Sequence, residues 1–72
     1  MLQGIYSLYD RRDGSFSPVF HASNHSVACR TFARICAQDK EFADDYRLYQ
    51  LGTFNASTGL LEALKEEVAL ER

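Results

Sequence analysis

The sequence predicts a small α+β domain in which an antiparallel sheet of three or four strands packs on one main helix. Three observations support this class: two short aromatic stretches joined by a turn, one stretch with apolar residues at helical spacing, and a later stretch that is apolar on both faces. The expected order is strand, strand, helix, strand, then a short strand or a C-terminal helix. With 72 residues there is room for one domain, residues 1–72, with an acidic C-terminal segment at about 60–72.

The first two strands are expected to form a β-hairpin. Residues 5–9 are aliphatic and aromatic, and the polar run after them closes with an Asp-Gly dipeptide ending at Gly14, which favours a tight turn. Residues 15–20 form the second candidate strand. Because Pro18 has no N–H for a ladder hydrogen bond, this strand is expected at an edge or a bulge.

A helix is expected over about residues 24–38. Ser23 or Asn24 can supply its N-cap. Its apolar residues recur at helical spacing, at Ala28, Phe32, Ile35 and Cys36. Cys29 and Cys36 are seven residues apart on this helix, ~10.5 Å along its axis at ~1.5 Å per residue, so they cannot bridge each other. Free thiols indicate a reducing cytoplasm.

The second half of the chain is expected to contain a loop, a central strand and an ambiguous end. Residues 38–45 have no clean period and predict a loop that holds at most a turn of helix. Residues 46–54 are apolar on both faces, as in a central strand, and residues 55–59 have turn chemistry. Leu60, Leu61, Leu64 and Val68 then suit a terminal helix, although residues 60–63 could return as a short strand.

Composition and motifs exclude several classes of function. No segment approaches the ~18 apolar residues of a membrane span, so the chain is expected to be soluble and to have no membrane partner. Neither a glycine-rich phosphate loop nor a nucleophile elbow is present, so we expect no enzyme, no catalytic residue and no cofactor. His25 and Cys29 lie four apart, but their spacing fits no standard zinc pattern, so no metal is expected.

The charge distribution leaves room for a local anion-binding surface. The net charge of -2 argues against a strongly basic nucleic-acid binder, yet residues 1–36 hold four arginines against two acids. Arg30 and Arg34 lie four apart with no acid between Val27 and Gln38, and such a pair can grip successive phosphates. They could instead pair with the acidic second half or face water. Arg11 and Arg12 form a second basic pair at the hairpin tip, where a solvated turn is the alternative.

Aromatic residues provide the second argument for nucleic-acid binding. Four Tyr and five Phe are present, and a sheet that displays rings beside arginines can stack bases without reading sequence. Tyr9 and Tyr49 are the better candidates because each lies on the less apolar face of its strand, and Arg47 shares the face of Tyr49. The packing of the core is expected to use Phe20, Phe32 and Phe54.

Five stretches carry a family resemblance through their order and spacing: Tyr6–Asp10, Pro18–Phe20, Ala28–Phe32, Asp45–Asn55 and Thr58–Gly59. Over about residues 4–60 the chain resembles the small nonstructural protein of gokushoviruses, single-stranded DNA phages of the Microviridae. The resemblance implies a replication-associated protein of the host cytoplasm that binds DNA and assists the switch to single-strand synthesis. Asn55 stands where the family pattern has Asp, and the acidic tail lies outside the match.

Two expectations concern partners. So small a core indicates a homodimer or larger assembly, formed through an edge strand or the C-terminal segment. The preferred ligand is single-stranded DNA. The alternative function is a protein-interaction factor that docks on the phage replication initiator or a capsid precursor without touching DNA. A helix over residues 62–71, acidic on one side and apolar on the other, would make that contact.

Overall fold

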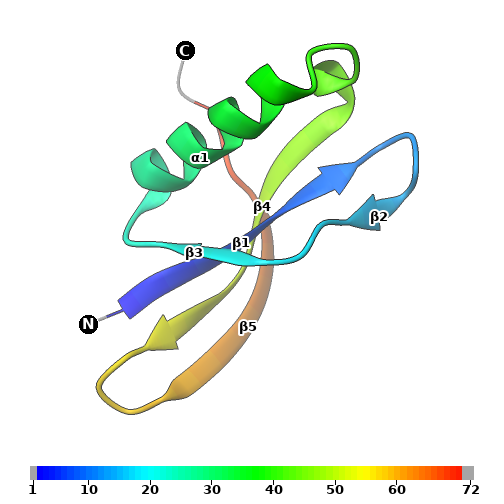
Figure 1. The fold of residues 1–72 in the computed structure, drawn as a ribbon. Coiled ribbons are helices and arrows are strands. Elements are labelled where there is room, and N and C mark those ends of the chain that lie inside the picture. The colour runs from blue at the N-terminus through cyan, green and yellow to red at the C-terminus, as the bar shows by residue number, and fades with distance from the viewer. Residues whose placement is uncertain (1, 71–72) are drawn as a thin grey trace.

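The computed structural model describes residues 2–70 and confirms an α+β fold (Figure 1). All its strands form one antiparallel sheet in the order β2-β1-β4-β5, and β3 pairs with β1 beside β2. The elements are β1 (Leu2–Asp10), β2 (Ser15–Phe16), β3 (Phe20–Ala22), α1 (His25–Gln38), the 3₁₀ turn η1 (Ala43–Asp45), β4 (Tyr46–Asn55) and β5 (Leu60–Glu67).

The expected second strand is split in two, so the sheet has five strands and not three or four. β2 and β3 are separated by Ser17, Pro18 and Val19, and both pair with the same edge of β1. Pro18 has no N–H to donate to a ladder, and Ser17 supplies two of the hydrogen bonds to β1 at this break. The Ser17 N–H donates to the Leu8 carbonyl at 2.8 Å, and the Ser17 hydroxyl accepts from the Leu8 N–H at 3.0 Å.

Helix α1 confirms the expected helix almost to the residue. The Asn24 side chain caps its N-terminus by accepting from the Val27 N–H at 2.9 Å, which satisfies one of the free donors of the first turn. Ala28 and Phe32 are the buried residues of the helix. Cys29 and Cys36 are both free thiols, as their spacing predicted.

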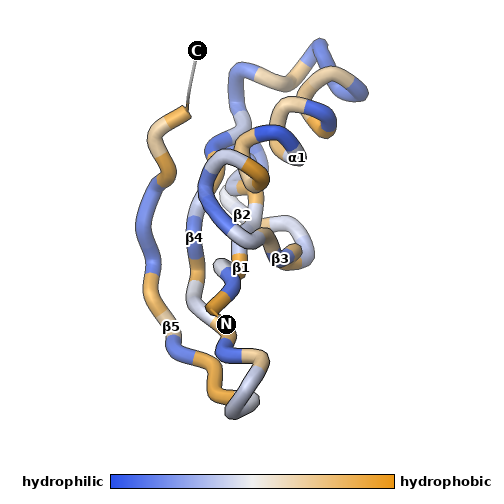
Figure 2. The backbone as a smooth tube through the Cα atoms, turned by 90° about the vertical axis from the view of Figure 1, so that its left-hand side faces the viewer, coloured by the Kyte–Doolittle hydropathy of each residue, from blue (hydrophilic) through white to orange (hydrophobic). Residues whose placement is uncertain are grey.

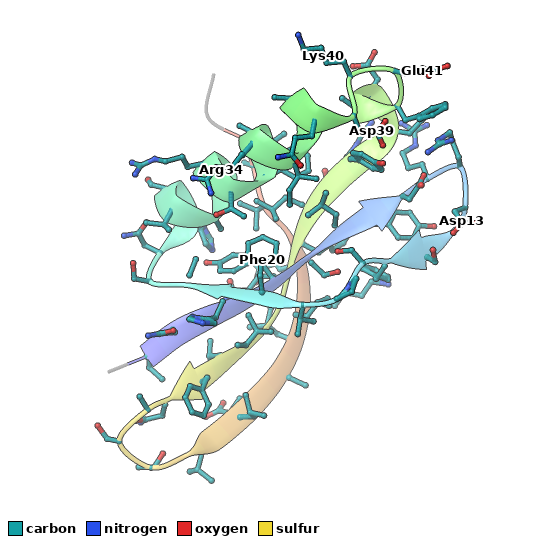
Figure 3. All side chains as sticks on the ribbon, in the orientation of Figure 1. Asp13, Phe20, Arg34, Asp39, Lys40 and Glu41 are labelled. Carbon is teal, nitrogen blue, oxygen red and sulfur yellow. The ribbon has the colours of Figure 1, made fainter. Side chains whose placement is uncertain are left out.

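The core lies between α1 and one face of the sheet, which we call the covered face. Successive strand residues point to opposite faces, so Tyr6 and Leu8 of β1 share this face with Leu48 of β4. Ala22 and Val68 complete the sheet side of the core, and Phe20 packs against its margin (Figure 3). In Figures 1 and 2 the helix covers only the part of the sheet away from the β4–β5 turn.

Of the two alternatives for the end of the chain, the C-terminal helix is wrong: residues 60–67 form the edge strand β5, which includes the strand expected over residues 60–63. Gly59 has a positive φ of 77°, and its N–H donates to the Asn55 carbonyl at 2.7 Å, so the chain reverses directly onto β4. Leu60, Leu64 and Val68 are four residues apart, a spacing that places them on one side of a helix and equally on one face of a strand. Val68 enters the core, where its N–H donates to the Leu48 carbonyl at 2.9 Å.

A bulge in β4 changes the expected division of its side chains between the two faces. The register with β1 shifts between Ile5 and Tyr6, and the register with β5 shifts around Leu51. Beyond the bulge, Phe54 pairs with Gln3 and therefore lies on the face opposite the helix. The expected packing of Phe54 in the core is wrong for this reason, whereas Phe32 is buried there. Within residues 2–70 no helix has the length and apolarity to cross a membrane.

Candidate nucleic-acid interface

The face of the sheet opposite α1 carries the best candidate site, and we call it the open face. Strand alternation places the odd-numbered residues of β1 and β5 on it, together with Arg47 and Tyr49 of β4. Tyr9 pairs with Phe16 on one side and with Arg47 on the other. In the next row of the sheet, Tyr49 lies between Ser7 of β1 and Glu67 of β5.

Three rings gather at one end of this face, and we call Tyr9, Phe16 and Tyr49 the aromatic cluster. Ring centroids are 4.9 Å apart for Tyr9 and Phe16, 5.5 Å for Phe16 and Tyr49, and 6.0 Å for Tyr9 and Tyr49. Both contacts of Tyr49 are edge-to-face, an arrangement favoured by the ring quadrupole. Phe16 is 40% exposed and the two tyrosines are half-buried, so the cluster is open to a ligand.

Ser7 of β1, which pairs with Tyr49 across the β1–β4 ladder, is satisfied by hydrogen bonds within the protein. Ser7 is fully buried, and its hydroxyl donates to the Ser17 carbonyl at 2.7 Å. Its oxygen also lies 3.1 Å from the Ser17 hydroxyl oxygen. Side-chain hydrogen bonds therefore join β1 to the β2–β3 connection, and among residues 2–70 no buried side-chain polar atom lacks a partner.

Two cations and one acid border the aromatic cluster. The Nζ atom of Lys65 lies 5.7 Å from the Phe16 ring centroid, within range of a cation–π contact. The Arg47 guanidinium donates to the carbonyls of Asp44 at 2.8 Å and Tyr46 at 2.9 Å, which fixes its position without neutralising it. Glu67 pairs with Tyr49 across the β4–β5 ladder and adds one negative charge to the same region.

The predicted arginine pair on the helix lies apart from this cluster. Arg30 and Arg34 are exposed on α1, which packs on the covered face, and Arg34 extends from the outer surface of the helix (Figure 3). Neither forms an ion pair within residues 2–70. The structure therefore brings Tyr9, Tyr49 and Arg47 together as predicted, but it separates them from Arg30 and Arg34 by the thickness of the sheet.

Of the two arginines at the hairpin tip, one is committed to internal contacts. Arg12 forms ion pairs with Asp10 at 3.2 Å and Asp45 at 3.3 Å, and its guanidinium carbon lies 3.6 Å from the centroid of the Phe42 ring. It joins the β1–β2 turn to η1. The side chain of Arg11 is exposed, and its backbone N–H donates to the Asp45 carbonyl at 3.0 Å.

The histidine and cysteine residues of α1 make contacts within the protein that account for them without a metal ion. His25 places its Nε2 atom 3.1 Å from the Gln50 Oε1 atom and makes an edge contact with the Tyr6 ring at 5.8 Å. Burial, and then the charge of Asp39, raise the pKa of the Cys36 thiol above its usual value of 9.0. Within residues 2–70, no three His, Cys, Asp or Glu side chains are grouped so that they could hold a metal ion.

Comparison with known proteins gives one informative match. A family model described as phage ORF5 protein matches residues 3–72. The chain belongs to this phage ORF5 protein family. The membership confirms the phage origin that the resemblance implied, and it includes the acidic C-terminal segment, which the resemblance did not. No curated protein and no solved structure matches the chain.

Sequence reasoning missed two residues of the candidate site, Phe16 and Lys65, in this ORF5 family member. Phe16 was expected to share a face with Phe20, but the break at Pro18 places it beside Tyr9 instead. Lys65 falls in the segment for which the sequence predicts an acidic helix. Strict alternation along residues 60–67 would have placed it on the same face as Leu61 and Glu67, because a strand repeats every two residues.

Proposed function

We propose that this phage protein binds single-stranded DNA, without sequence preference, through the open face of its sheet. The observation that carries the proposal is the aromatic cluster of Tyr9, Phe16 and Tyr49, held on an uncovered sheet face with Lys65 beside it. Stacking of a base on an exposed aromatic ring is worth ~1–3 kcal/mol and tolerates any base, because each base has a π-face.

The surrounding charges favour weak and salt-sensitive binding. Lys65 and Arg47 can contact the phosphates on either side of a stacked base, whereas Glu67 repels them. The overall charge of -2 adds no attraction at long range. Affinity must therefore come mainly from stacking, which suits a protein that covers unpaired strands transiently.

The biological setting follows from the family and the resemblance together. The family model supports a phage protein, and the resemblance favours the gokushoviruses of the Microviridae, whose genomes are single-stranded DNA. In the host cytoplasm, a protein that covers unpaired strands would assist viral genome replication or the switch to single-strand synthesis. The alternative of docking on the replication initiator or a capsid precursor relied on an acidic C-terminal helix, and that segment is a strand.

The deciding experiment compares two labelled oligonucleotides of equal length and charge, one of thymidines and one of abasic sites. Fluorescence anisotropy titration of the wild-type protein should show tighter binding to oligo-dT, because only that ligand can stack. Phe16→Leu should lose most of this preference, a change of ~1–3 kcal/mol in binding free energy. Phe16→Tyr keeps the ring and serves as the matched control, which should retain the preference.

Two results would contradict the proposal. One is wild-type protein that binds neither oligonucleotide at low salt. The other is equal binding of thymidine and abasic ligands, which would assign any affinity to phosphate contacts alone. Circular dichroism of each variant checks that the sheet is intact, and Phe16 lies at an exposed edge strand where a leucine is readily accommodated.

A further inference from the structure

The outer edge of β5 is a long edge of the sheet that is left open. β5 pairs with β4 on one side, and within residues 2–70 no strand pairs with its other side. Alternate residues along this eight-residue strand therefore present unpaired backbone donors and acceptors, which are a template for another strand. Leu60 and Leu61, at the start of this strand, are 65% and 69% exposed.

We propose that β5 pairs antiparallel with β5 of a second copy of this chain, about a twofold axis at Ala63. The inference goes beyond the proposed DNA binding and does not depend on it. A second copy is the natural occupant because a strand whose edge is free in one copy is free in the other, and a twofold antiparallel ladder satisfies both at once.

Charge disfavours several of the possible registers. In a symmetric antiparallel pair, opposing residues lie on the same face, so the axis must pass through a residue position. If the axis passes through Glu62, Glu62 of one copy lies opposite Glu62 of the other. An axis through Lys65 does the same for Lys65. An axis at Leu64 places Glu62 opposite Glu66 twice. Like charges directly opposite each other destabilise a ladder, so these registers are disfavoured.

The register about Ala63 avoids every such clash and pairs residues 60–66. Ala63 lies opposite its own copy, and Leu61 lies opposite Lys65, whose aliphatic stem can cover it. On the other face, Leu64 lies opposite Glu62. Ala63 itself neighbours Gly52 in β4, which has no side chain, so both small residues leave the centre of the new ladder unobstructed.

The same register gives the exposed end of the β4–β5 hairpin a place to pack. This end of the hairpin extends beyond α1 (Figure 1). Leu2 and Leu60 both pair with Asn55 there and are exposed. In the dimer, residues 56–59 of one copy lie beside residues 67–70 of the other. That segment borders an open groove of about 590 Å³, whose apolar lining includes Phe32, Val68 and Leu70. Leu60 then lies diagonal to Val68 of the second copy, at the mouth of the groove.

The arrangement has one geometric consequence for the open face. A twofold axis perpendicular to the sheet keeps the two open faces on the same side, so the dimer would have one continuous sheet of ten strands. Two aromatic clusters, one in each copy, would then face the same direction at opposite ends of that sheet.

The test uses complementary charges at the axis. Ala63→Glu and Ala63→Lys each place like charges opposite each other, and Ala63 is exposed, so both variants should fold as wild type does. Sedimentation velocity should show a wild-type dimer at micromolar concentration, monomers for each variant alone, and a dimer when the two variants are mixed. Ala33→Glu, an equal charge change on the exposed side of α1, should leave the dimer intact.

Three results would overturn the inference: a wild-type protein that stays monomeric up to millimolar concentration, a dimer that survives both substitutions, or variants that remain monomeric when mixed. If a variant does not fold, a measurement on the wild-type protein alone tests the ladder. Amide hydrogen exchange of β5 should slow as the protein concentration rises through the dimer transition, because the outward N–H groups become paired. Unchanged exchange would contradict the ladder. No DNA is present in either measurement, so the outcome is independent of the DNA-binding test.

Discussion

Leu48 and Tyr49 are neighbours in β4, yet they belong to opposite faces of the sheet with different environments. Leu48 is 1% exposed and packs in the core beneath α1, whereas Tyr49 is half-buried and its ring contacts the two other rings of the aromatic cluster on the open face. The contrast holds where α1 covers the sheet; beyond the helix, Leu2 and Leu60 of the covered face are exposed as well. Apolar area on the covered face contributes to stability, while that on the open face remains available to a ligand.

The largest expected effect tests this contrast directly. Leu48→Ala should lower the free energy of unfolding by ~2–5 kcal/mol, because it removes a fully buried side chain and leaves a cavity. Tyr49→Ala should cost less stability but should weaken binding to oligo-dT. Urea denaturation and anisotropy titration measure the two quantities. A Tyr49→Ala protein that is as unstable as Leu48→Ala and binds DNA normally would show that the two faces do not differ as proposed.

Much of the covered face could be predicted from the sequence because its elements have strong local signals. The helix has apolar residues at the right period and a capping residue before it, and both features appear in the structure. The end of the chain could not be assigned, because leucines four residues apart fit a strand and a helix equally. The Asn55–Gly59 turn selects the strand, because its hydrogen bond reverses the chain so that residues 60–67 pair with β4.

The second prediction concerns the helix cap, which stabilises the covered face from outside the core. Asn24→Ala removes the acceptor for the Val27 N–H and should cost ~1 kcal/mol of stability. Binding to oligo-dT should not change, because the cap lies on the side of the sheet away from the aromatic cluster. Ser23→Ala, one residue earlier and also exposed, is the matched control and should have a smaller effect on the denaturation midpoint.

The third prediction asks whether the arginines of the helix add to binding on the open face. Removing one side chain that binds a phosphate of a single strand flattens the slope of log affinity against log salt by ~0.7, so Arg30→Ala with Arg34→Ala should flatten it by at most ~1.4. A strand must pass around the sheet to reach both surfaces, so we expect a change well below that limit. Lys65→Gln, beside the aromatic cluster, should flatten the slope by up to ~0.7.

The assignment of the two faces would change if the double arginine variant flattened the salt slope more than Lys65→Gln does. The helix surface would then be the principal phosphate-binding surface, and the open face would serve another ligand. Sequence alone could not separate these surfaces. Strand alternation predicted that Arg47 and Tyr49 share a face, but the sequence showed neither which face α1 covers nor the bulge in β4.

The smallest expected effect is a pH dependence at the end of the covered face. The Tyr46 hydroxyl donates to the Asp39 carboxylate, and this hydrogen bond, followed by burial, raises the pKa of Tyr46 above its ordinary value of 10.0. Because the pKa is higher in the folded state than in the unfolded state, the bond stabilises the fold fully below about pH 10, and the stabilisation is lost as the pH rises further. Tyr46→Phe should therefore show a smaller decrease in the free energy of unfolding above pH 10 than wild type. Tyr6 and Cys36, whose pKa values are also raised, mainly by burial, titrate in both proteins and cancel in the difference. Urea denaturation at pH 8 and above pH 10 measures this decrease in the free energy of unfolding for each protein. An identical decrease in wild type and Tyr46→Phe would show that the hydrogen bond to Asp39 does not contribute to stability.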